Sequence, residues 1–301
     1  MDLPIKLQIP DSFYEEEEKC GSLITKEEKK IWAIELDLLN EFKRICDKYN
    51  LKWYIAYGSL IGTIRHKGFI PWDNDVDVWM PRIDFHELCK HSDEFVHPYF
   101  LQTPHTENGR YFSNYCKLCN SLTTGSWKGL YDLGVNCGLF LDIFIIDEIP
   151  DDKCLEKRIL NKIGFYSHFE IFINSKDSKQ FSIKKSVRYL IWKYFLHKCN
   201  GAVLFDKIDQ ICYENTGKGY NQVGYFPSPY GNRDRAPKEC WAETLWMDFE
   251  MLKVPVPIGY HTILSNIYGD YMQLPSIDKR VTHEYLDMSP DIPYTVFWKN
   301  S

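Results

Sequence analysis

Long hydrophobic runs and a surplus of basic residues are both missing from this chain of 301 residues. No apolar run reaches the roughly 18 residues that a helix needs to span a bilayer, which argues against an integral membrane protein. The 36 Lys and Arg residues are outnumbered by 42 Asp and Glu, so the formal net charge is −6. A protein that binds nucleic acid by broad phosphate neutralisation usually carries the opposite balance, and we expect no nucleic-acid partner.

Paired cysteine motifs are also scarce, although the chain contains ten cysteines. Only Cys116 and Cys119 form a C-x-x-C, and no second pair follows at the spacing of a zinc site. The beginning of the sequence shows no signal-like pattern. Scattered thiols are typical of proteins in a reducing compartment, so we expect a cytoplasmic protein.

The rest of the composition is that of an ordinary globular protein. Hydrophobic residues make up 44% of the chain and charged residues 26%, which argues against a disordered or collagen-like chain. The length predicts one large domain or two closely packed ones. We divide the chain into an N-terminal tail (1–24) that wraps or frays, a core (25–150), a helical region (151–215) and a C-terminal part (216–301) that packs back on the core.

Hydrophobic periodicity predicts helices and strands for these regions. Thr25 and Glu28 form a capping box, and the apolar residues that follow recur at helical spacing, so we expect an amphipathic helix over 26–49. Strands are expected over 51–57, 75–80, 99–102, 111–118, 122–127, 138–146 and 252–254. Further helices are expected to end near 66 and to cover 81–90, 153–198 (as one or two helices), 203–214 and 259–268.

Two carboxylates, Asp75 and Asp77, stand on one of the predicted strands. Alternate residues of a strand point to the same face, so these two side chains project together. Neighbouring carboxylates repel unless a cation lies between them, and Mg²⁺ takes one or two carboxylates plus phosphate oxygens of a substrate. The pair therefore suggests a site for Mg²⁺ or Mn²⁺, although a lone D-x-D also occurs by chance on surface strands. Asp73, just before the pair, is equally well explained as a loop cap.

Other polar residues are candidates for the same site. Asp142 lies inside an otherwise apolar predicted strand, where a charge is costly unless it is paired or coordinated. Gly58 and Ser59 end a predicted strand, and such a turn offers backbone N–H groups and a hydroxyl to a phosphate. Arg65 suits a diphosphate because a guanidinium donates two parallel hydrogen bonds, and Lys117 is a further phosphate-binding candidate. A structural Asp142 and a solvated Arg65 stay open as alternatives.

The residues around these candidates carry a longer pattern. The stretch 53–77 reads WYIAYGSLIGTIRHKGFIPWDNDVD, and the stretch 138–147 is an apolar strand with a central Asp. A second block consists of 254–257 (VPVP), 268–275 (YGDYMQLP), Lys279, Arg280 and His283. Together these motifs, spread over residues 50–285, resemble the LicD family, which includes bacterial phosphocholine transferases and resembles the fukutin-related ribitol-phosphate transferases.

The resemblance implies an α+β fold of the nucleotidyltransferase type, similar to polymerase β. In such a fold a mixed sheet is flanked by helices and the carboxylates lie at a strand edge, here with an added helical region. By the resemblance, Asp75 and Asp77 would hold the metal and Asp142 would be the third catalytic carboxylate and metal ligand. Gly58 and Ser59 would contact the donor phosphates.

The resemblance also implies an activity. It predicts metal-dependent transfer of a substituted phosphate, phosphocholine or a polyol phosphate, from a CDP-linked donor, with release of CMP. The acceptor would be a hydroxyl of a cell-surface glycan, such as lipopolysaccharide or teichoic acid, or of its lipid-linked precursor. A D-x-D glycosyltransferase, a nucleotidyltransferase that releases pyrophosphate, and a catalytically silent binding protein remain as alternatives. The chain departs from the family pattern at Asn74, Cys119 and Ser276, none of which is an expected metal ligand.

Basic charge is concentrated in the predicted helical region. Residues 151–198 contain eleven Lys or Arg against five Asp or Glu, so the rest of the chain is strongly acidic. Such helices suit an anionic acceptor or a peripheral contact with the inner face of the membrane. A solvated helix face is the ordinary alternative.

Aromatic residues are abundant, at 16% of the chain. Aromatic rings bind quaternary ammonium groups through cation–π contacts, so Trp72, Trp79, Trp127 or Tyr131 are candidate walls of a choline site. Ordinary core packing is the alternative for each of these rings, and we prefer it.

Overall fold

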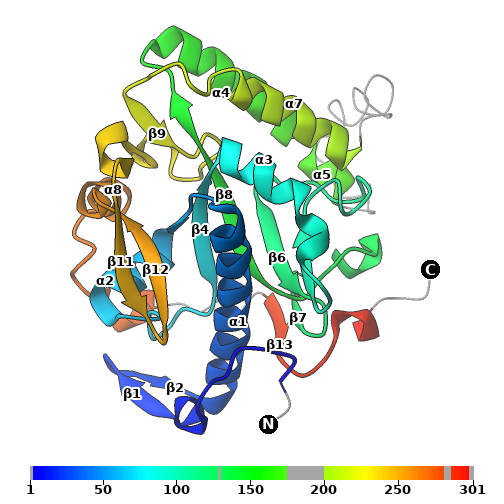
Figure 1. Ribbon diagram of the computed structural model, residues 1–301, viewed down its shortest axis with the longest axis vertical. Coiled ribbons are helices and arrows are strands. Elements are labelled where there is room, and N and C mark those ends of the chain that lie inside the picture. Colours follow the sequence, from blue (N-terminus) through cyan, green and yellow to red (C-terminus); the bar gives the residue numbers. More distant parts are fainter. Residues whose placement is uncertain (1–2, 128–129, 175–199, 281–285, 298–301) are drawn as a thin grey trace.

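A mixed sheet of seven strands lies at the centre of the computed structural model, which describes residues 3–127, 130–174, 200–280 and 286–297. Its strands are β3 (Tyr54–Ile55), β4 (Val76–Pro81), β5 (Tyr99–Gln102), β6 (Cys116–Asn120), β8 (Leu139–Ile149), β9 (Gln222–Gly224) and β10 (Arg235–Pro237). Strands β4 and β8 are parallel, and the other pairs are antiparallel. The expected mixed sheet flanked by helices is thus confirmed (Figure 1).

Helices cover the sheet, and some of them lie beyond one of its ends (Figure 1). They are α1 (Lys26–Tyr49), α2 (Tyr57–His66), α3 (Arg82–Lys90), α4 (Lys153–Ser167), α5 (Glu170–Ile173), α7 (Gly201–Tyr213) and α8 (Tyr260–Tyr268). Antiparallel pairs outside the sheet are β1 (Glu17–Lys19) with β2 (Ser22–Ile24), β11 (Thr244–Phe249) with β12 (Leu252–Pro257), and β7 (Thr124–Trp127) with β13 (Leu286–Ser289). Within the described ranges, no helix combines the length and the apolar character that a bilayer crossing requires.

Helix α1 has the bounds that its sequence pattern predicts. The capping box at its start is formed, with the Thr25 side chain accepting from the Glu28 N–H and the Glu28 carboxylate accepting from the Thr25 N–H. Asn50 ends the helix in a left-handed conformation. The apolar side of α1 packs on β6 and β8 and includes the buried side chains of Trp32 and Phe42. One long amphipathic helix therefore covers β8, the strand that carries Asp142, and its neighbour β6.

The N-terminal tail wraps around the core. The backbone N–H groups of Lys6 and Leu7 both donate to the Asp37 carboxylate on α1, at 2.9 and 2.8 Å. Asn120, at the end of β6, donates its side-chain amide to the Pro4 carbonyl. Because these partners are side chains of the core, the first residues are held by specific hydrogen bonds.

Two predicted strands are wrong over part of their length. The strand predicted over 51–57 is paired only at Tyr54–Ile55, because the chain turns into α2 at Tyr57. Gly58 and Ser59 consequently lie in the first turn of α2, where the sequence predicts a turn after a strand. The strand predicted over 111–118 begins only at Cys116, and the buried rings of Tyr111 and Phe112 lie in the loop before it.

The helical region lies beyond one end of β8, where α4 and α7 pack side by side (Figure 1). The helices predicted over 153–198 are confirmed as α4 and α5 up to residue 173. The predicted helical residues 175–198, which include most of the basic positions, lie outside the described residues. Strand β9 returns from the C-terminal part to pair with the end of β8.

Candidate functional site

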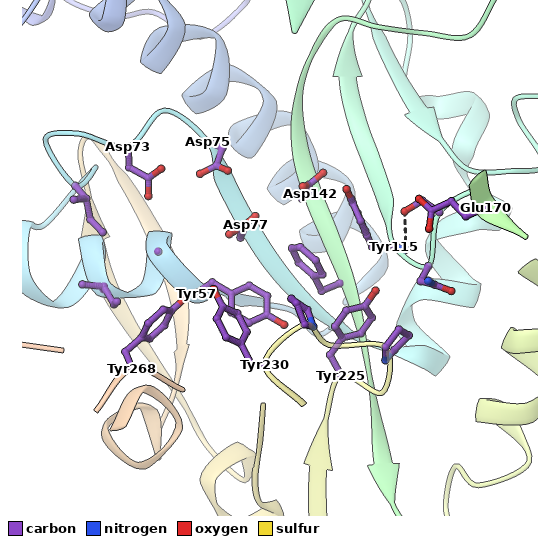
Figure 2. A pocket seen from close by; sticks show the side chains of 18 residues that line it. Tyr57, Asp73, Asp75, Asp77, Tyr115, Asp142, Glu170, Tyr225, Tyr230 and Tyr268 are labelled. Atoms are coloured by element: carbon purple, nitrogen blue, oxygen red, sulfur yellow. Dashed lines mark hydrogen bonds between the residues drawn. The ribbon is translucent and has the colours of Figure 1, made fainter. Parts of the chain in front are cut away.

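A cavity of about 620 Å³ opens over the parallel strands β4 and β8. Four carboxylates line one part of it, and six aromatic rings and a further carboxylate line the rest (Figure 2). The four carboxylates are those of Asp73, Asp75, Asp77 and Asp142. The remaining acid is Glu170, and the rings are those of Tyr57, Tyr115, Phe144, Tyr225, Tyr230 and Tyr268.

The strand register explains why the predicted carboxylates meet. Asp75 immediately precedes β4, Asp77 is two residues further, and alternate residues of a strand share a face. The register of the parallel pair sets Asp77 directly beside Asp142 of β8. The structure therefore brings the three carboxylates predicted to be catalytic to one cavity, together with Gly58 from α2.

Like charges dominate the electrostatics of this cluster. Burial raises the pKa of Asp77 well above its usual range, and the charges of Asp75, Asp142 and Asp73 raise it further. Burial also raises the pKa of Asp73, against the effect of a hydrogen bond to the Asp75 side chain. The charges of these neighbouring acids thus oppose one another inside the cavity. Such a cluster attracts a cation.

The donor set fits a divalent cation that is shared with a substrate. Within the described ranges, no three His, Cys, Asp or Glu side chains are placed to bind one metal ion by themselves. However, Mg²⁺ commonly takes only one or two carboxylates and completes its shell with phosphate oxygens and water. Asp75 and Asp77 offer oxygen ligands only, and their mutual repulsion favours a cation between them. The pair fits Mg²⁺ or Mn²⁺ on these grounds, whereas a ready-made three-carboxylate cluster is not formed.

Lys117 lies behind the carboxylates, although the sequence suggests a phosphate contact. It stands opposite Asp142 in the β6–β8 register, and its Nζ is 3.4 Å from the Asp142 Oδ1. The same ammonium lies over the Phe140 ring, 3.0 Å from its centroid, and the residue is buried. Lys117 therefore balances the charge of Asp142 and does not line the cavity.

Gly58 and Ser59 serve the cluster in different ways. A Cβ on Gly58 would lie 2.7 Å from the Asp73 Oδ2, so only glycine lets that carboxylate approach α2 so closely. The buried Ser59 hydroxyl accepts from the Asp77 N–H at 3.0 Å and donates to the Asp75 carbonyl at 3.5 Å. Ser59 thus fixes the backbone that carries both carboxylates.

Replacement of Ser59 by Ala tests this positioning. We expect about 1–2 kcal/mol of lost stability, because a buried N–H loses its acceptor. We also expect kcat to fall roughly tenfold to a hundredfold, since small displacements of catalytic groups are costly. Thr63→Ala is the matched control, because its buried hydroxyl bonds the Ser59 carbonyl within the same helix. Equal losses of kcat in the two variants, measured well below both melting temperatures, would contradict a positioning role.

Arg65 is not brought to the cavity. Its Nη1 donates to the Tyr271 carbonyl at 2.7 Å, and its Nε donates to the His66 Nε2 at 2.8 Å. Burial lowers the pKa of Arg65, and the charge of Arg280 lowers it further. Arg65 therefore ties the end of α2 to the C-terminal part and does not line the cavity.

The aromatic candidates for a choline site are not the rings that line the cavity. Trp79 is fully buried, with edge-on contacts to Tyr57 and Trp241. Trp72 lies under the Arg280 guanidinium, and Tyr131 belongs to a small separate cluster. The side chain of Trp127 is outside the described residues.

Sequence reasoning missed the tyrosines of the cavity and Glu170. These residues come from α2, the loop before β6, the loop after β9, α5 and α8, and no periodicity in the sequence links them. Tyr57 has a positive φ of 41°, a conformation that is unusual for a bulky residue and typical of functional sites. Its hydroxyl donates to the Asp234 carboxylate. For Asp73, the two-residue spacing with Asp75 and Asp77 was an available signal.

Comparisons with known proteins agree with the motifs. Residues 50–128 match the family described as LicD/FKTN/FKRP, nucleotidyltransferase domain. The lipopolysaccharide cholinephosphotransferase LicD of Haemophilus influenzae is 27% identical over 258 residues, which are 82% of this chain and 92% of that protein. Mannosyltransferase regulator 4 of Saccharomyces cerevisiae is 28% identical over 109 residues, 35% of this chain but only 9% of the yeast protein.

Proposed function

Because this chain belongs to the LicD family of transferases, we propose that it transfers phosphocholine from CDP-choline to a hydroxyl of a glycan and releases CMP. The acceptor would be a cell-surface glycan, such as lipopolysaccharide, or its lipid-linked precursor. The observation that carries the proposal is the cavity over β4 and β8, where Asp75, Asp77 and Asp142 converge. Phosphocholine is preferred over a polyol phosphate because the relative aligned over most of both chains is named a cholinephosphotransferase.

The fold and the location of the protein form part of the proposal. The match of residues 50–128 to a nucleotidyltransferase domain supports a sheet of that type, with residues 25–150 as the catalytic core. We also propose a cytoplasmic protein that contacts the inner face of the membrane through basic helices. The exposed Lys157, Arg158 and Lys162 of α4 support this contact, which co-sedimentation with anionic vesicles would test.

The first step that the cavity must perform is to hold the donor phosphates. Asp75 and Asp77 would bind Mg²⁺ or Mn²⁺, which when present neutralises phosphate charge during transfer. Ser59 keeps both residues in place through their backbone, and Gly58 leaves room for Asp73 beside them. The chain thus supplies fixed carboxylates at one position of a cavity that is otherwise lined largely by aromatic rings.

The second step is the attack of the acceptor hydroxyl on the phosphorus that bears the head group. A bond forms between the acceptor oxygen and that phosphorus, and the bond to the bridging oxygen of CMP breaks. Asp142 takes the proton of the acceptor hydroxyl as a general base. Lys117, 3.4 Å from the Asp142 Oδ1, holds this carboxylate on the β8 side of the cavity.

Product analysis tests the proposal. The protein is incubated with Mg²⁺, an oligosaccharide from deacylated lipopolysaccharide, and one of four compounds: CDP-choline, CDP-ribitol, CTP or UDP-glucose. We expect CMP and a phosphocholine-bearing oligosaccharide, detected by mass spectrometry, with CDP-choline only. Transfer from CDP-ribitol alone would mean that the transferred group is ribitol phosphate and not phosphocholine. Pyrophosphate from CTP would instead indicate a nucleotidyltransferase, and consumption of a sugar nucleotide such as UDP-glucose would indicate a glycosyltransferase.

A further inference from the structure

One corner of the cavity combines three aromatic rings with the carboxylate of Glu170. The Tyr115 and Phe144 rings are stacked with centroids 5.0 Å apart, and the Tyr225 ring meets Phe144 edge-on at 5.3 Å. All four residues line the cavity, and in Figure 2 Tyr115 lies between Asp142 and Glu170. The corner therefore adjoins the proposed catalytic carboxylates without being part of them.

The charge of Glu170 is not used by the mechanism proposed above. Burial alone raises the pKa of Glu170 to about 7, because no cation among the described residues offsets the loss of hydration. The pKa of Tyr115 is raised well above its usual range, first by the charge of Asp142, then by burial and, less strongly, by Glu170. Burial raises the pKa of Tyr225, and Glu170 contributes there too. The Glu170 carboxyl is therefore within electrostatic reach of both phenols.

These features define the chemistry of a ligand. A dehydrated carboxylate favours a cation, and aromatic faces favour a large cation that gives up its hydration easily. No Lys, Arg or His is among the residues that line the cavity, so the described part of the chain supplies no such cation itself. A quaternary ammonium group meets both requirements, whereas a neutral polyol meets neither.

We propose that Glu170 and the rings of Tyr115, Phe144 and Tyr225 bind the quaternary ammonium head group of the donor. The inference rests on the proposed function, because it places the head group next to the carboxylates that would hold the donor phosphates. The corner then selects choline over ribitol by charge. It also explains why an acidic residue of α5, outside the matched family domain, faces this cavity.

Binding measurements separate this role from a general structural one. Calorimetric titrations with Mg²⁺ compare CDP-choline, CDP, and a CDP ester of 3,3-dimethylbutanol, in which carbon replaces the charged nitrogen. We expect the wild-type protein to bind CDP-choline about tenfold more tightly than the other two. Glu170→Gln is expected to remove most of this preference and to leave CDP affinity unchanged. Glu214→Gln, at an exposed acid directly after α7, is the matched control and should bind all three ligands as wild type does.

The rings are tested in the same way. Tyr225→Leu should also lower the affinity for CDP-choline about tenfold, whereas Tyr225→Phe, which keeps the ring, should leave that affinity unchanged. Unchanged affinity for CDP shows in each case that the variant is folded and that its phosphate site is intact.

The outcomes distinguish the inference from the proposed function. If Glu170→Gln and Tyr225→Leu lower the affinities for CDP and CDP-choline equally, the corner binds the cytosine base and the inference is overturned. If wild type prefers CDP-choline and Glu170→Gln keeps that preference, the inference alone is overturned. If wild type binds CDP and CDP-choline equally, both the inference and the choline head group of the proposed function are overturned.

Discussion

Asp77→Asn is expected to lower turnover at least about a thousandfold while the protein stays folded. Asp77 stands directly beside Asp142 in the strand register and two residues from Asp75, at the centre of the carboxylate cluster. An amide keeps the shape of the side chain but loses the charge that would bind a divalent cation. Because burial and neighbouring acids raise the pKa of Asp77, the charge is unfavourable in the metal-free protein. The substitution should therefore not lower the melting temperature without metal.

Two measurements check this expectation. Initial rates of CMP release give the loss of turnover, and melting curves with and without Mg²⁺ show whether the ion still stabilises the protein. The wild-type protein should melt at a higher temperature with Mg²⁺ and the Asp77→Asn variant should not. Asp248→Asn, at a half-exposed acid of β11, is the control and should behave as wild type. Retained turnover in the Asp77→Asn variant would contradict the metal assignment.

The sequence predicts the elements that local patterns determine. Helix α1 has the predicted bounds because its capping box and apolar spacing lie within one segment. The convergence of Asp75, Asp77 and Asp142 was also predictable, since polar residues within apolar strands are costly unless they meet partners. The nucleotidyltransferase type of the fold stays a prediction from the family motifs.

The partners of individual side chains were harder to predict, because they depend on contacts far along the chain. Arg65 donates to a carbonyl of Tyr271, which lies more than two hundred positions away. Ser59 bonds the backbone of the segment 75–77, and this choice depends on how α2 packs on β4. Glu170 lines the cavity although it belongs to the short helix α5, far along the chain from the strands that carry the carboxylates. Motifs therefore identified the carboxylates that meet in the cavity, whereas packing decided which other residues face them.

The second large effect concerns stability and lies in a buried ion network at the end of β8. Arg82, the first residue of α3, donates through Nε and Nη2 to the two carboxylate oxygens of Asp147, both at 2.6 Å. Its Nη1 donates to Asp209 of α7, which also bonds His86. The Asp147 side chain is fully buried, and the Arg82 side chain is 5% exposed. The network joins α3, β8 and α7.

Arg82→Met is expected to lower the free energy of unfolding by about 3–5 kcal/mol, because it leaves the Asp147 carboxylate buried without its cation. Burial already raises the pKa of Asp147 against the effect of the Arg82 charge, so loss of that charge worsens an unfavourable position. Denaturant unfolding of each variant measures the change. Lys48→Met, which removes an exposed ion pair with Glu94, is the control and should cost no more than about 1 kcal/mol.

The double variant Arg82→Met with Asp147→Leu identifies the source of that loss. If the cost of Arg82→Met comes from the stranded carboxylate, removing the carboxylate as well should restore most of the stability, since apolar replacements of buried ion pairs are often neutral. If the double variant is as unstable as Arg82→Met, the cost comes instead from the loss of the bond between Arg82 and Asp209 and from the packing of α7. A loss below about 1 kcal/mol for Arg82→Met would mean that water reaches Asp147, which would contradict the burial of this ion network. Because Arg82, Asp147 and Asp209 do not line the cavity, loss of this network should lower turnover only near the melting temperature.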